Sequence, residues 1–365
     1  MTDTSIFTGK SGLTERFFAG TARPGKSFRD ECEELLARCR ESLGGGPAVM
    51  RLHVSDIANQ TAVVEMLTAA MGVSVAVVGQ APVCGSRVAM EAYTMDLPSS
   101  PSLTDGVLSL RLRNYELLFM GSALTSERGS GPQMAAELRA VAEVLARRGG
   151  TIANNLQRTW IYCRDIDNNY AGLVESRRRY FTEQGLTADT HYIASTGIEG
   201  QSHPHDRLVR MDSFALFGHD PAQIEYMQAL DNLSPTHVYG VTFERGTRII
   251  YGDRSHYLLS GTASIDRHGK TLYECDVVAQ AERVIDNVTA LLENHGGTLA
   301  DMRQAVVYLR DPADAGLVEA VMSRRLSAEM PRIMVKGSVC RPGWLVELDG
   351  MAVNANGDPR FKEFC

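Results

Sequence analysis

The feature that most constrains this fold is an internal repeat. Residues 117–181 and 257–326 share three strings in the same order: Gly-Gly-Thr, then Arg-Asp, then the pentapeptide Ala-Gly-Leu-Val-Glu. In the two copies these strings begin at 149 and 296, 164 and 310, and 171 and 315, so the separation stays between 144 and 147 residues. Such self-similarity at a nearly fixed period indicates a duplicated structural unit. The chain is therefore expected to contain two copies of one module.

Each copy predicts the same succession of elements. An apolar run that ends at Gly121 or Gly261 is typical of a strand entering a turn. A long amphipathic helix follows, then a strand (304–309 in the second copy), a second helix (313–328) and a final strand pair. The first helix of the second copy carries apolar residues at three- and four-residue steps, namely Val277, Ala281, Val284, Ile285, Val288, Leu291 and Leu292. This β-α-β-α-β order predicts an α+β fold with the helices on one face of the sheet.

The rest of the chain is divided around these copies. We expect an N-terminal extension, two modules and a polar tail that frays, at residues 1–110, 111–220, 236–354 and 355–365. Within the extension, 73–80 and 87–95 are strand-like and flank a turn, which predicts a strand hairpin.

Composition narrows the choice of partner. Against 44 Asp and Glu the chain has 37 Lys and Arg, and a net charge of −7 argues against a nucleic-acid partner. The basic run Arg177-Arg178-Arg179 is interpreted as the solvated face of a helix. No apolar run approaches the roughly 20 residues that cross a bilayer, so no membrane partner is expected. The polar N-terminus and seven scattered cysteines predict a cytoplasmic protein with reduced thiols.

No motif supports a cofactor. Gly44-Gly45-Gly46 lacks the Lys-Ser/Thr that completes a phosphate-binding loop, and there is no G-x-G-x-x-G string. His203 and His205 stand in a polar loop with no evident third ligand, which favours a solvated loop over a metal site. We expect neither a cofactor nor a metal.

The repeat also carries a family resemblance. From Ser260-Gly261-Thr262 to Val346-Glu347-Leu348-Asp349-Gly350 the second copy resembles the Rid/YjgF/UK114 superfamily. The first copy, with Arg158-Thr159-Trp160-Ile161-Tyr162 and Ala194-Ser195-Thr196-Gly197-Ile198, is similar to a two-module subgroup that includes the chorismatases. The resemblance covers roughly residues 70–354. It implies two tandem Rid-like (chorismate-mutase-like) modules, with the C-terminal modules associating as a homotrimer.

The resemblance to simple Rid proteins also shows a departure. Those proteins hydrolyse enamines and imines and hold the substrate carboxylate with the arginine of a P-x-R pattern, since guanidinium pairs well with carboxylate. This chain has Pro331-Arg332-Ile333, with the arginine one position early. On a strand, such a shift moves a side chain to the opposite face. Arg332 therefore counts against a plain imine deaminase.

The resemblance to chorismatases implies two catalytic residues. Glu347 matches the carboxylate of the V-E-(I/L)-(D/E)-G strand, and Cys340 stands seven residues before it. In that family a Cys at this position goes with 3-hydroxybenzoate formation, and an Ala with hydrolysis to a dihydrodiol acid. Expelling pyruvate from an enol ether needs a proton donor, and burial raises the pKa of a carboxyl group toward neutrality. Glu347 is therefore expected to be the general acid.

The implied substrate, chorismate, is a dicarboxylate and requires cationic anchors. The motif positions suggest Arg158, Arg245 and Arg325 as anchors, and Tyr162, Thr196 and Tyr239 as hydrogen-bond donors. Trp160 is expected to be a core residue.

Two alternatives stay open at this point. One is a Rid-like hydrolase or lyase acting on another small carboxylated imine, enamine or enol ether in specialised metabolism. The other is a non-catalytic regulator that binds a small ligand.

Overall fold

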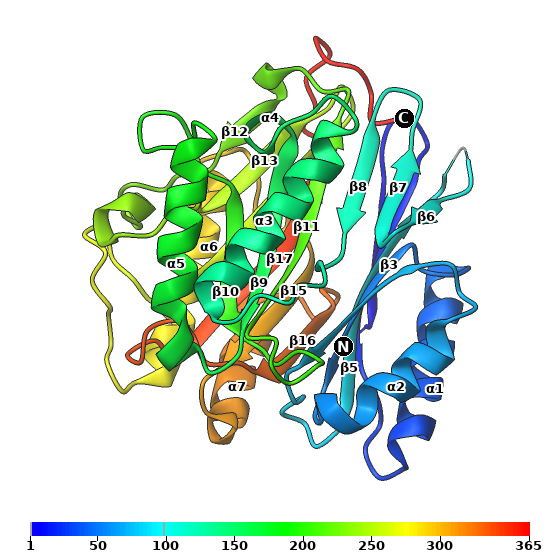
Figure 1. Ribbon diagram of the computed structural model, residues 1–365, viewed down its shortest axis with the longest axis vertical. Coiled ribbons are helices and arrows are strands. Elements are labelled where there is room, and N and C mark those ends of the chain that lie inside the picture. The colour runs from blue at the N-terminus through cyan, green and yellow to red at the C-terminus, as the bar shows by residue number, and fades with distance from the viewer. Residues whose placement is uncertain (1, 98) are drawn as a thin grey trace.

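The protein is described by a computed structural model that covers residues 2–97 and 99–365. The chain forms three β-sheets, each flanked by helices, and the sheets face a common centre (Figure 1). We call the three parts the N-terminal, middle and C-terminal units, for residues 4–95, 102–217 and 224–354.

The N-terminal unit is a five-stranded sheet with two helices, in the strand order β1-β2-β5-β3-β4. Helix α1 begins at the capping residue Ser27, whose hydroxyl accepts a hydrogen bond from the Asp30 amide. It ends at Gly44, which adopts a left-handed conformation at φ 67°. The elements are β1 (Thr4–Thr8), β2 (Thr14–Thr21), α1 (Phe28–Leu43), β3 (Val49–Val54), α2 (Ile57–Thr68), β4 (Ser74–Gly79) and β5 (Val88–Met95).

The middle unit has six strands in the order β10-β9-β11-β8-β7-β6. Its elements are β6 (Ser102–Thr104), β7 (Val107–Arg111), β8 (Glu116–Met120), α3 (Ser130–Ala146), α4 (Ile152–Asn155), β9 (Leu156–Cys163), α5 (Ile166–Glu183), β10 (Ala194–Glu199) and β11 (Val209–Phe217).

The C-terminal unit has the strand order β12-β13-β14-β17-β15-β16. Its elements are β12 (Ile224–Tyr226), β13 (Gly246–Ile250), β14 (Ser255–Ala263), α6 (Val277–Glu293), β15 (Met302–Leu309), α7 (Ala315–Arg325), β16 (Arg332–Lys336) and β17 (Val346–Asn354). Four short 3-10 turns lie in the loops, at Pro221–Gln223, Thr236–Tyr239, Leu299–Asp301 and Pro312–Asp314.

The three units share one topology. Each runs β-β-α-β-α-β-β, and the strand orders β1-β2-β5-β3-β4, β7-β8-β11-β9-β10 and β13-β14-β17-β15-β16 correspond one to one. The predicted α+β fold with helices on one face is confirmed, but the supposed extension is a third unit of the same kind. Each unit carries a similar triplet at the same place in its fold. The three triplets are Gly20-Thr21-Ala22, Gly121-Ser122-Ala123 and Gly261-Thr262-Ala263.

Two expectations for the ends of the chain are corrected. The strands β4 and β5 do form, but they lie on either side of β3, parallel and antiparallel to it, so they are not a hairpin. The C-terminal tail is docked rather than frayed. Phe364 is fully buried, its amide donates to Asp253 Oδ1 at 2.8 Å, and its ring packs edge-on against Tyr251 and His256.

The apolar core is divided into four clusters. Three lie between a sheet and its own helices, and the fourth lies between the sheets, where residues such as Tyr93, Leu117 and Leu258 from the three units meet. The face of the C-terminal sheet that looks toward the centre is thus covered by the other two units. A homotrimer of C-terminal modules would have to form through another surface. Among the described helices, none combines the length and the apolar character needed to span a bilayer.

Candidate active site

A small enclosed cleft lies where the middle and C-terminal units meet. Strand β10 runs beside β14, and helix α5 contributes side chains from the middle unit. The cleft has a volume of about 30 Å³. It is lined by residues of both units, among them Tyr170, Arg177, Ser195, Tyr239, Arg245, Gly261, Cys340, Arg341, Trp344 and Glu347.

The carboxyl group of Glu347 is the acid of this cleft. Its strand, β17, lies between β14 and β15, where Ala263 and Tyr308 are its cross-strand neighbours. The side chain packs on Gly261, where an added methyl group would lie only 2.1 Å from Glu347 Oε1. The residue is 4% exposed, and no described residue donates a hydrogen bond to its carboxyl group. A side chain at position 261 would therefore displace the acid.

Burial and a neighbouring carboxylate raise the pKa of Glu347 to about 8. Loss of solvent is the largest cause, and the negative charge of Asp349 adds to it, while Arg158 and Arg245 act in the opposite direction. At neutral pH the group is therefore mostly protonated and can donate a proton.

Two buried arginines in the cleft lack acidic partners among the described residues. Arg177 is 3% exposed, and its guanidinium donates to Thr242 Oγ1 at 3.3 Å and to Ser195 Oγ at 3.4 Å. Arg245 is 4% exposed and donates from Nε and Nη2 to the Ser234 carbonyl, at 3.2 and 2.9 Å. Neither has a carboxylate oxygen within 4.0 Å among the described residues, although buried charges are normally paired. These cations are suited to an anionic ligand.

Cys340 and two tyrosines complete the wall. Burial, together with the nearby Glu347, raises the pKa of the Cys340 thiol to about 12, so it remains protonated. A thiol in that state is a poor nucleophile and behaves as a small apolar group. The Tyr239 ring lies 5.3 Å from the Arg245 guanidinium and meets Trp344 edge-on, while Tyr170 faces Cys340.

The structure brings only part of the predicted site together. Glu347, Cys340, Tyr239 and Arg245 line the cleft. Arg325 does not: it is half-buried at the end of α7, where it pairs with two residues of helix α6, Glu282 and Asp286, the latter through Oδ1 at 2.7 Å. The family motif therefore assigned a substrate-binding role to a residue that lies outside the cleft.

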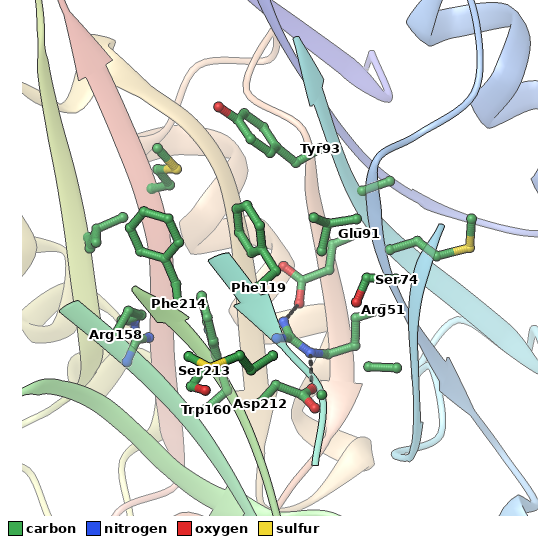
Figure 2. Close-up of a pocket in the computed structure, with 18 of the residues that line it drawn as sticks. Arg51, Ser74, Glu91, Tyr93, Phe119, Arg158, Trp160, Asp212, Ser213 and Phe214 are labelled. Atoms are coloured by element: carbon green, nitrogen blue, oxygen red, sulfur yellow. Dashed lines mark hydrogen bonds and ion pairs between the residues drawn. The ribbon is translucent and has the colours of Figure 1, made fainter. Parts of the chain in front are cut away.

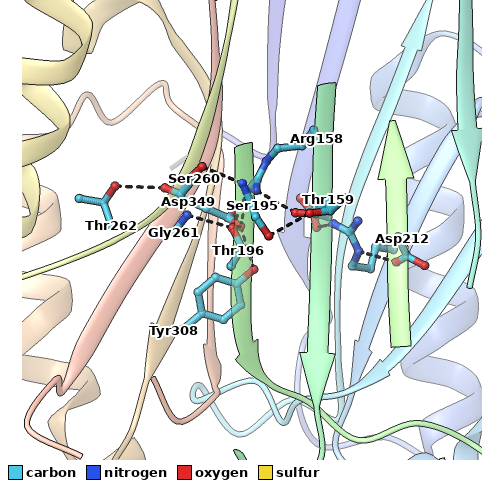
Figure 3. A network of polar contacts seen from close by, with 12 residues as sticks. Arg158, Thr159, Ser195, Thr196, Asp212, Ser260, Gly261, Thr262, Tyr308 and Asp349 are labelled. Carbon is cyan, nitrogen blue, oxygen red and sulfur yellow. Dashed lines mark hydrogen bonds and ion pairs between the residues drawn. The ribbon is translucent and has the colours of Figure 1, made fainter. Parts of the chain in front are cut away.

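Arg158 and Thr196 lie behind the cleft in a closed polar network (Figure 3). Arg158 Nη2 donates to Thr196 Oγ1 at 2.5 Å and to Asp349 Oδ2 at 3.2 Å. The Thr196 hydroxyl donates to the same Asp349 oxygen at 2.6 Å and accepts from the Gly261 amide at 3.0 Å. Tyr308 also donates to Asp349, at 3.3 Å. Because Arg158 is already paired inside the protein, it is not a free anchor for a ligand.

Tyr162 is also displaced from the predicted site. It is 1% exposed, points toward the centre of the molecule, and its hydroxyl has no hydrogen-bond partner among the described residues. Trp160, expected in the core, lies nearby between the guanidinium groups of Arg51 and Arg158, at 4.7 and 4.8 Å.

Arg177 is the residue that sequence reasoning missed. Its basic run was expected to be a solvated face, and Arg178 and Arg179 are indeed exposed, but Arg177 is buried in the cleft. The signal was helical spacing: Leu173 and Arg177 are four residues apart on the buried side of α5. Because Arg177 lies on the apolar stripe of the helix, it should have been predicted to be buried, unlike its neighbours Arg178 and Arg179.

Arg332 takes the orientation expected from its shifted position. It is 6% exposed and donates to Glu319 Oε1 at 2.6 Å and Ser323 Oγ at 3.0 Å, both on helix α7. It therefore lies on the helix side of the sheet and does not enter the cleft.

Comparison with known proteins agrees with this architecture. The family model described as Endoribonuclease L-PSP matches residues 250–354, which form most of the C-terminal unit. A chorismatase of Streptomyces rapamycinicus is 27% identical over 282 residues, covering 72% of this chain and 81% of the relative. A chorismatase of Streptomyces hygroscopicus is 26% identical over 279 residues, covering 72% and 78%.

A solved structure extends the likeness to the fold of nearly the whole chain. The crystal structure of a chorismatase aligns with a TM-score of 0.66 over 84% of this chain and 92% of the other, at 21% sequence identity. That alignment supports the arrangement of units described above.

Proposed function

We propose that this chain, which belongs to the chorismatase-like subgroup of the Rid/YjgF superfamily, is an enzyme that releases pyruvate from chorismate with Glu347 as general acid. One observation carries the proposal: a protonated carboxyl group shares a cleft with two buried arginines that have no acidic partner among the described residues. Such a site offers a proton and two positive charges to a dianionic ligand.

The charges suit a dicarboxylate. Arg177 comes from the middle unit and Arg245 precedes β13 of the C-terminal unit, so each can hold one carboxylate across the junction of the units. Arg177 replaces the two predicted anchors that do not line the cleft, Arg158 and Arg325. Holding a substrate at both ends fixes its reactive bond relative to the acid.

The reaction requires a proton at a defined carbon atom. The Glu347 carboxyl gives its proton to the terminal methylene of the enol ether, and the positive charge that develops is shared by the adjacent carbon and the ether oxygen. If water adds to that carbon, the hemiketal breaks into pyruvate and a dihydrodiol acid, with one water consumed. If the neighbouring ring hydroxyl adds to that carbon instead of water, its bond to the ring breaks while the ring loses a proton and becomes aromatic. The hemiketal that results releases pyruvate and a hydroxybenzoate, with no net water. In both routes the Glu347 carboxylate is reprotonated afterwards.

Cys340 would influence which route is followed. A protonated thiol occupies space beside the acid that a smaller side chain would leave to water. We therefore favour the hydroxybenzoate route for this chain, with hydrolysis as the second route. The ratio of the two products in Cys340→Ala measures the effect, and an unchanged ratio contradicts this role.

The cleft must widen to admit its substrate. A volume of about 30 Å³ holds only about two water molecules. Tyr239 and Arg341 lie at the rim, where Arg341 Nη2 donates to the Tyr239 carbonyl at 3.1 Å and Arg341 is exposed. Displacement of these two side chains would open the cleft without disturbing β14 or β17.

The test is pyruvate release from chorismate by the purified protein. Activity should fall as the pH rises above about 8, because Glu347 then loses the proton that the reaction needs. Absence of pyruvate release would remove the proposal.

Two further possibilities can be separated from it. A Rid-like hydrolase would turn over 2-aminoacrylate in preference to chorismate, although Arg332 is held by Glu319 on the helix side of the sheet. A non-catalytic binding protein would bind chorismate without turnover, and Glu347→Gln would leave its cellular phenotype intact.

We also propose that the protein works in the cytoplasm on a small carboxylate, without a nucleic-acid partner. In support, the seven cysteines Cys32, Cys39, Cys84, Cys163, Cys275, Cys340 and Cys365 are all free. The net charge of −7 is unfavourable for a phosphate backbone.

A further inference from the structure

A second cavity lies at the centre of the molecule, among the three sheets (Figure 2). Strands of all three units contribute to its wall, and its volume is about 110 Å³. Neither Glu347 nor Arg177 lines it. We call it the central cavity.

The wall of the central cavity is mainly apolar and aromatic. Tyr93, Phe119, Phe214, Leu117, Leu258 and Met351 supply most of it. An apolar cavity of about 150 Å³ in another protein binds benzene, so a single ring is the right scale of occupant. Water is a poor occupant of such a space, because each buried water needs two to four polar partners.

The charged groups of this wall are satisfied inside the protein. Arg51 pairs with Glu91 and with Asp212 Oδ2 at 3.3 Å (Figure 2), and Arg158 pairs with Asp349. A charged ligand would have to break one of these buried pairs, which is unfavourable. The central cavity therefore selects against ions and favours a neutral occupant.

One polar atom that faces the cavity lacks a hydrogen-bond partner among the described residues. Gln304, from the C-terminal unit, lies opposite Met351 on the neighbouring strand, so the two side chains share the face that lines the cavity. Its Oε1 atom is buried and accepts no hydrogen bond from any described residue. A buried polar group without a hydrogen bond is unfavourable. An occupant with a hydroxyl group would therefore supply the missing hydrogen bond.

The central cavity adjoins an open groove of about 730 Å³ between the N-terminal and middle units. The two spaces share four lining residues, Ser74, Val75, Met120 and Gly121. We therefore expect a small molecule to enter from the groove. Gly121 leaves space at this passage, because the nearest atom to a methyl group added there is the Gly106 carbonyl oxygen at 3.7 Å.

We propose that the central cavity is a binding site for a small neutral aromatic molecule that carries one hydroxyl group, with the ring against Phe119 and Phe214 and the hydroxyl donating a hydrogen bond to Gln304 Oε1. This site is separate from the catalytic cleft and takes an uncharged ligand, whereas the cleft takes a dianion.

Calorimetry with phenol, toluene and benzoate tests the chemistry. Phenol is expected to bind with one site per chain, toluene more weakly, and benzoate not at all. Gln304→Met should weaken phenol binding about fivefold, the value of one hydrogen bond, and leave toluene binding unchanged. Equal effects on phenol and toluene would overturn the role of Gln304.

The location is tested by filling the space. Ala76 lines the central cavity from β4, so Ala76→Phe should abolish phenol binding, while the control Val278→Phe, on the exposed side of α6, should not alter it. Undiminished binding to Ala76→Phe overturns the proposal.

If Ala76→Phe does not fold, a crystal of the unmodified protein soaked with 4-bromophenol decides the question. The bromine peak is expected in the central cavity, beside the packed rings of Phe119 and Phe214. A peak in the catalytic cleft, competition of phenol with chorismate, or ordered water alone in the central cavity would overturn the proposal.

Discussion

The catalytic cleft and the groove between the N-terminal and middle units are built from the same elements but hold different side chains. In the cleft, β14 and β17 face a helix of the preceding unit, α5; in the groove, β8 and β11 face α2. Pairing with the neighbouring strand shows which residues correspond. Glu347 lies opposite Tyr308, and Arg210 lies opposite Tyr162, the same position of the repeat.

The groove lacks the chemistry of the cleft at each decisive position. Arg210 replaces the acid and is tied to Asp212 Oδ1 at 2.9 Å. Thr68 stands on α2 where Arg177 stands on α5, twelve residues after the corresponding Asp56 and Asp165. The scaffold was therefore kept in both places. Among the described residues, a carboxyl group at this strand position and an unpaired arginine at this helix position occur only in the cleft, whereas the buried Glu137 of the groove lies on α3 and pairs with Arg207. The comparison teaches that activity depends on a few side chains rather than on the junction itself.

Removal of the acid should give the largest effect. Glu347→Gln keeps the shape of the side chain but cannot donate an acidic proton, so pyruvate release should fall about 10²-fold or more. The matched variant Arg210→Gln alters the equivalent position of the groove and should retain activity within about twofold. Steady-state assays of both proteins check this, and comparable losses in the two would contradict a single catalytic cleft.

Removal of the buried cation should follow in size. Arg177→Gln loses a charged hydrogen bond to a substrate carboxylate, so kcat/KM should fall about 10- to 100-fold, mainly through a higher KM. Arg178→Gln is the control, since Arg178 is exposed and donates to Glu175 and to the Gly240 carbonyl. Equal kcat/KM values for the two variants would exclude Arg177 as an anchor.

The glycine beside the acid should show a smaller effect. Gly261→Ala places a methyl group 2.1 Å from Glu347 Oε1, so the carboxyl must shift, and kcat should fall about tenfold, the cost of a misplaced proton donor. At Gly121 the nearest atom to an added methyl is 3.7 Å away, and Gly121→Ala should leave kcat unchanged. Rates and melting temperatures of both variants test this. A loss of melting temperature in Gly261→Ala without a loss of kcat would contradict it.

These comparisons also show how far the sequence could lead. Motifs identified four residues that line the cleft, because the strands or loops that carry them have a register that follows from the repeat. These residues are Glu347, Cys340, Tyr239 and Arg245. The N-terminal unit was missed because its helices and strands share little with the other copies beyond Gly20-Thr21-Ala22 and the helix cap Asp56. Topology is conserved through burial pattern and strand pairing, which tolerate replacement of nearly every residue.

The errors in the site have one physical cause. A motif marks a position, but the partner across the fold decides what the side chain does there. Arg158 forms an ion pair with Asp349, and Arg325 forms one with Glu282. Neither pairing can be predicted from a single sequence. Arg177 gains its role because no described carboxylate lies near it, which only the assembled cleft reveals.

The last effect concerns stability rather than rate, and it depends only on how the cleft changes the pKa of Glu347. Because the pKa of Glu347 is about 8 in the folded protein against 4.5 for an unperturbed group, the folded state binds more protons between these values. This group's contribution to the free energy of unfolding is therefore greatest at low pH and declines as the pH rises from about 4.5 to 8. Glu347→Gln removes that decline. Relative to the unmodified protein, the variant should gain roughly 1 kcal/mol of unfolding free energy per pH unit across this window, measured by urea denaturation.

The comparison with the groove supplies the control for that measurement. Arg210→Gln stands at the same strand position but removes no protonated carboxyl group, so its difference from the unmodified protein should not follow the pH in this way. Parallel stability curves for Glu347→Gln and the unmodified protein would mean that Glu347 is ionised in the cleft throughout. An ionised carboxylate could not give a proton to an enol ether. The cleft would then differ from the groove only in the charge at this strand position, and not in having a proton donor.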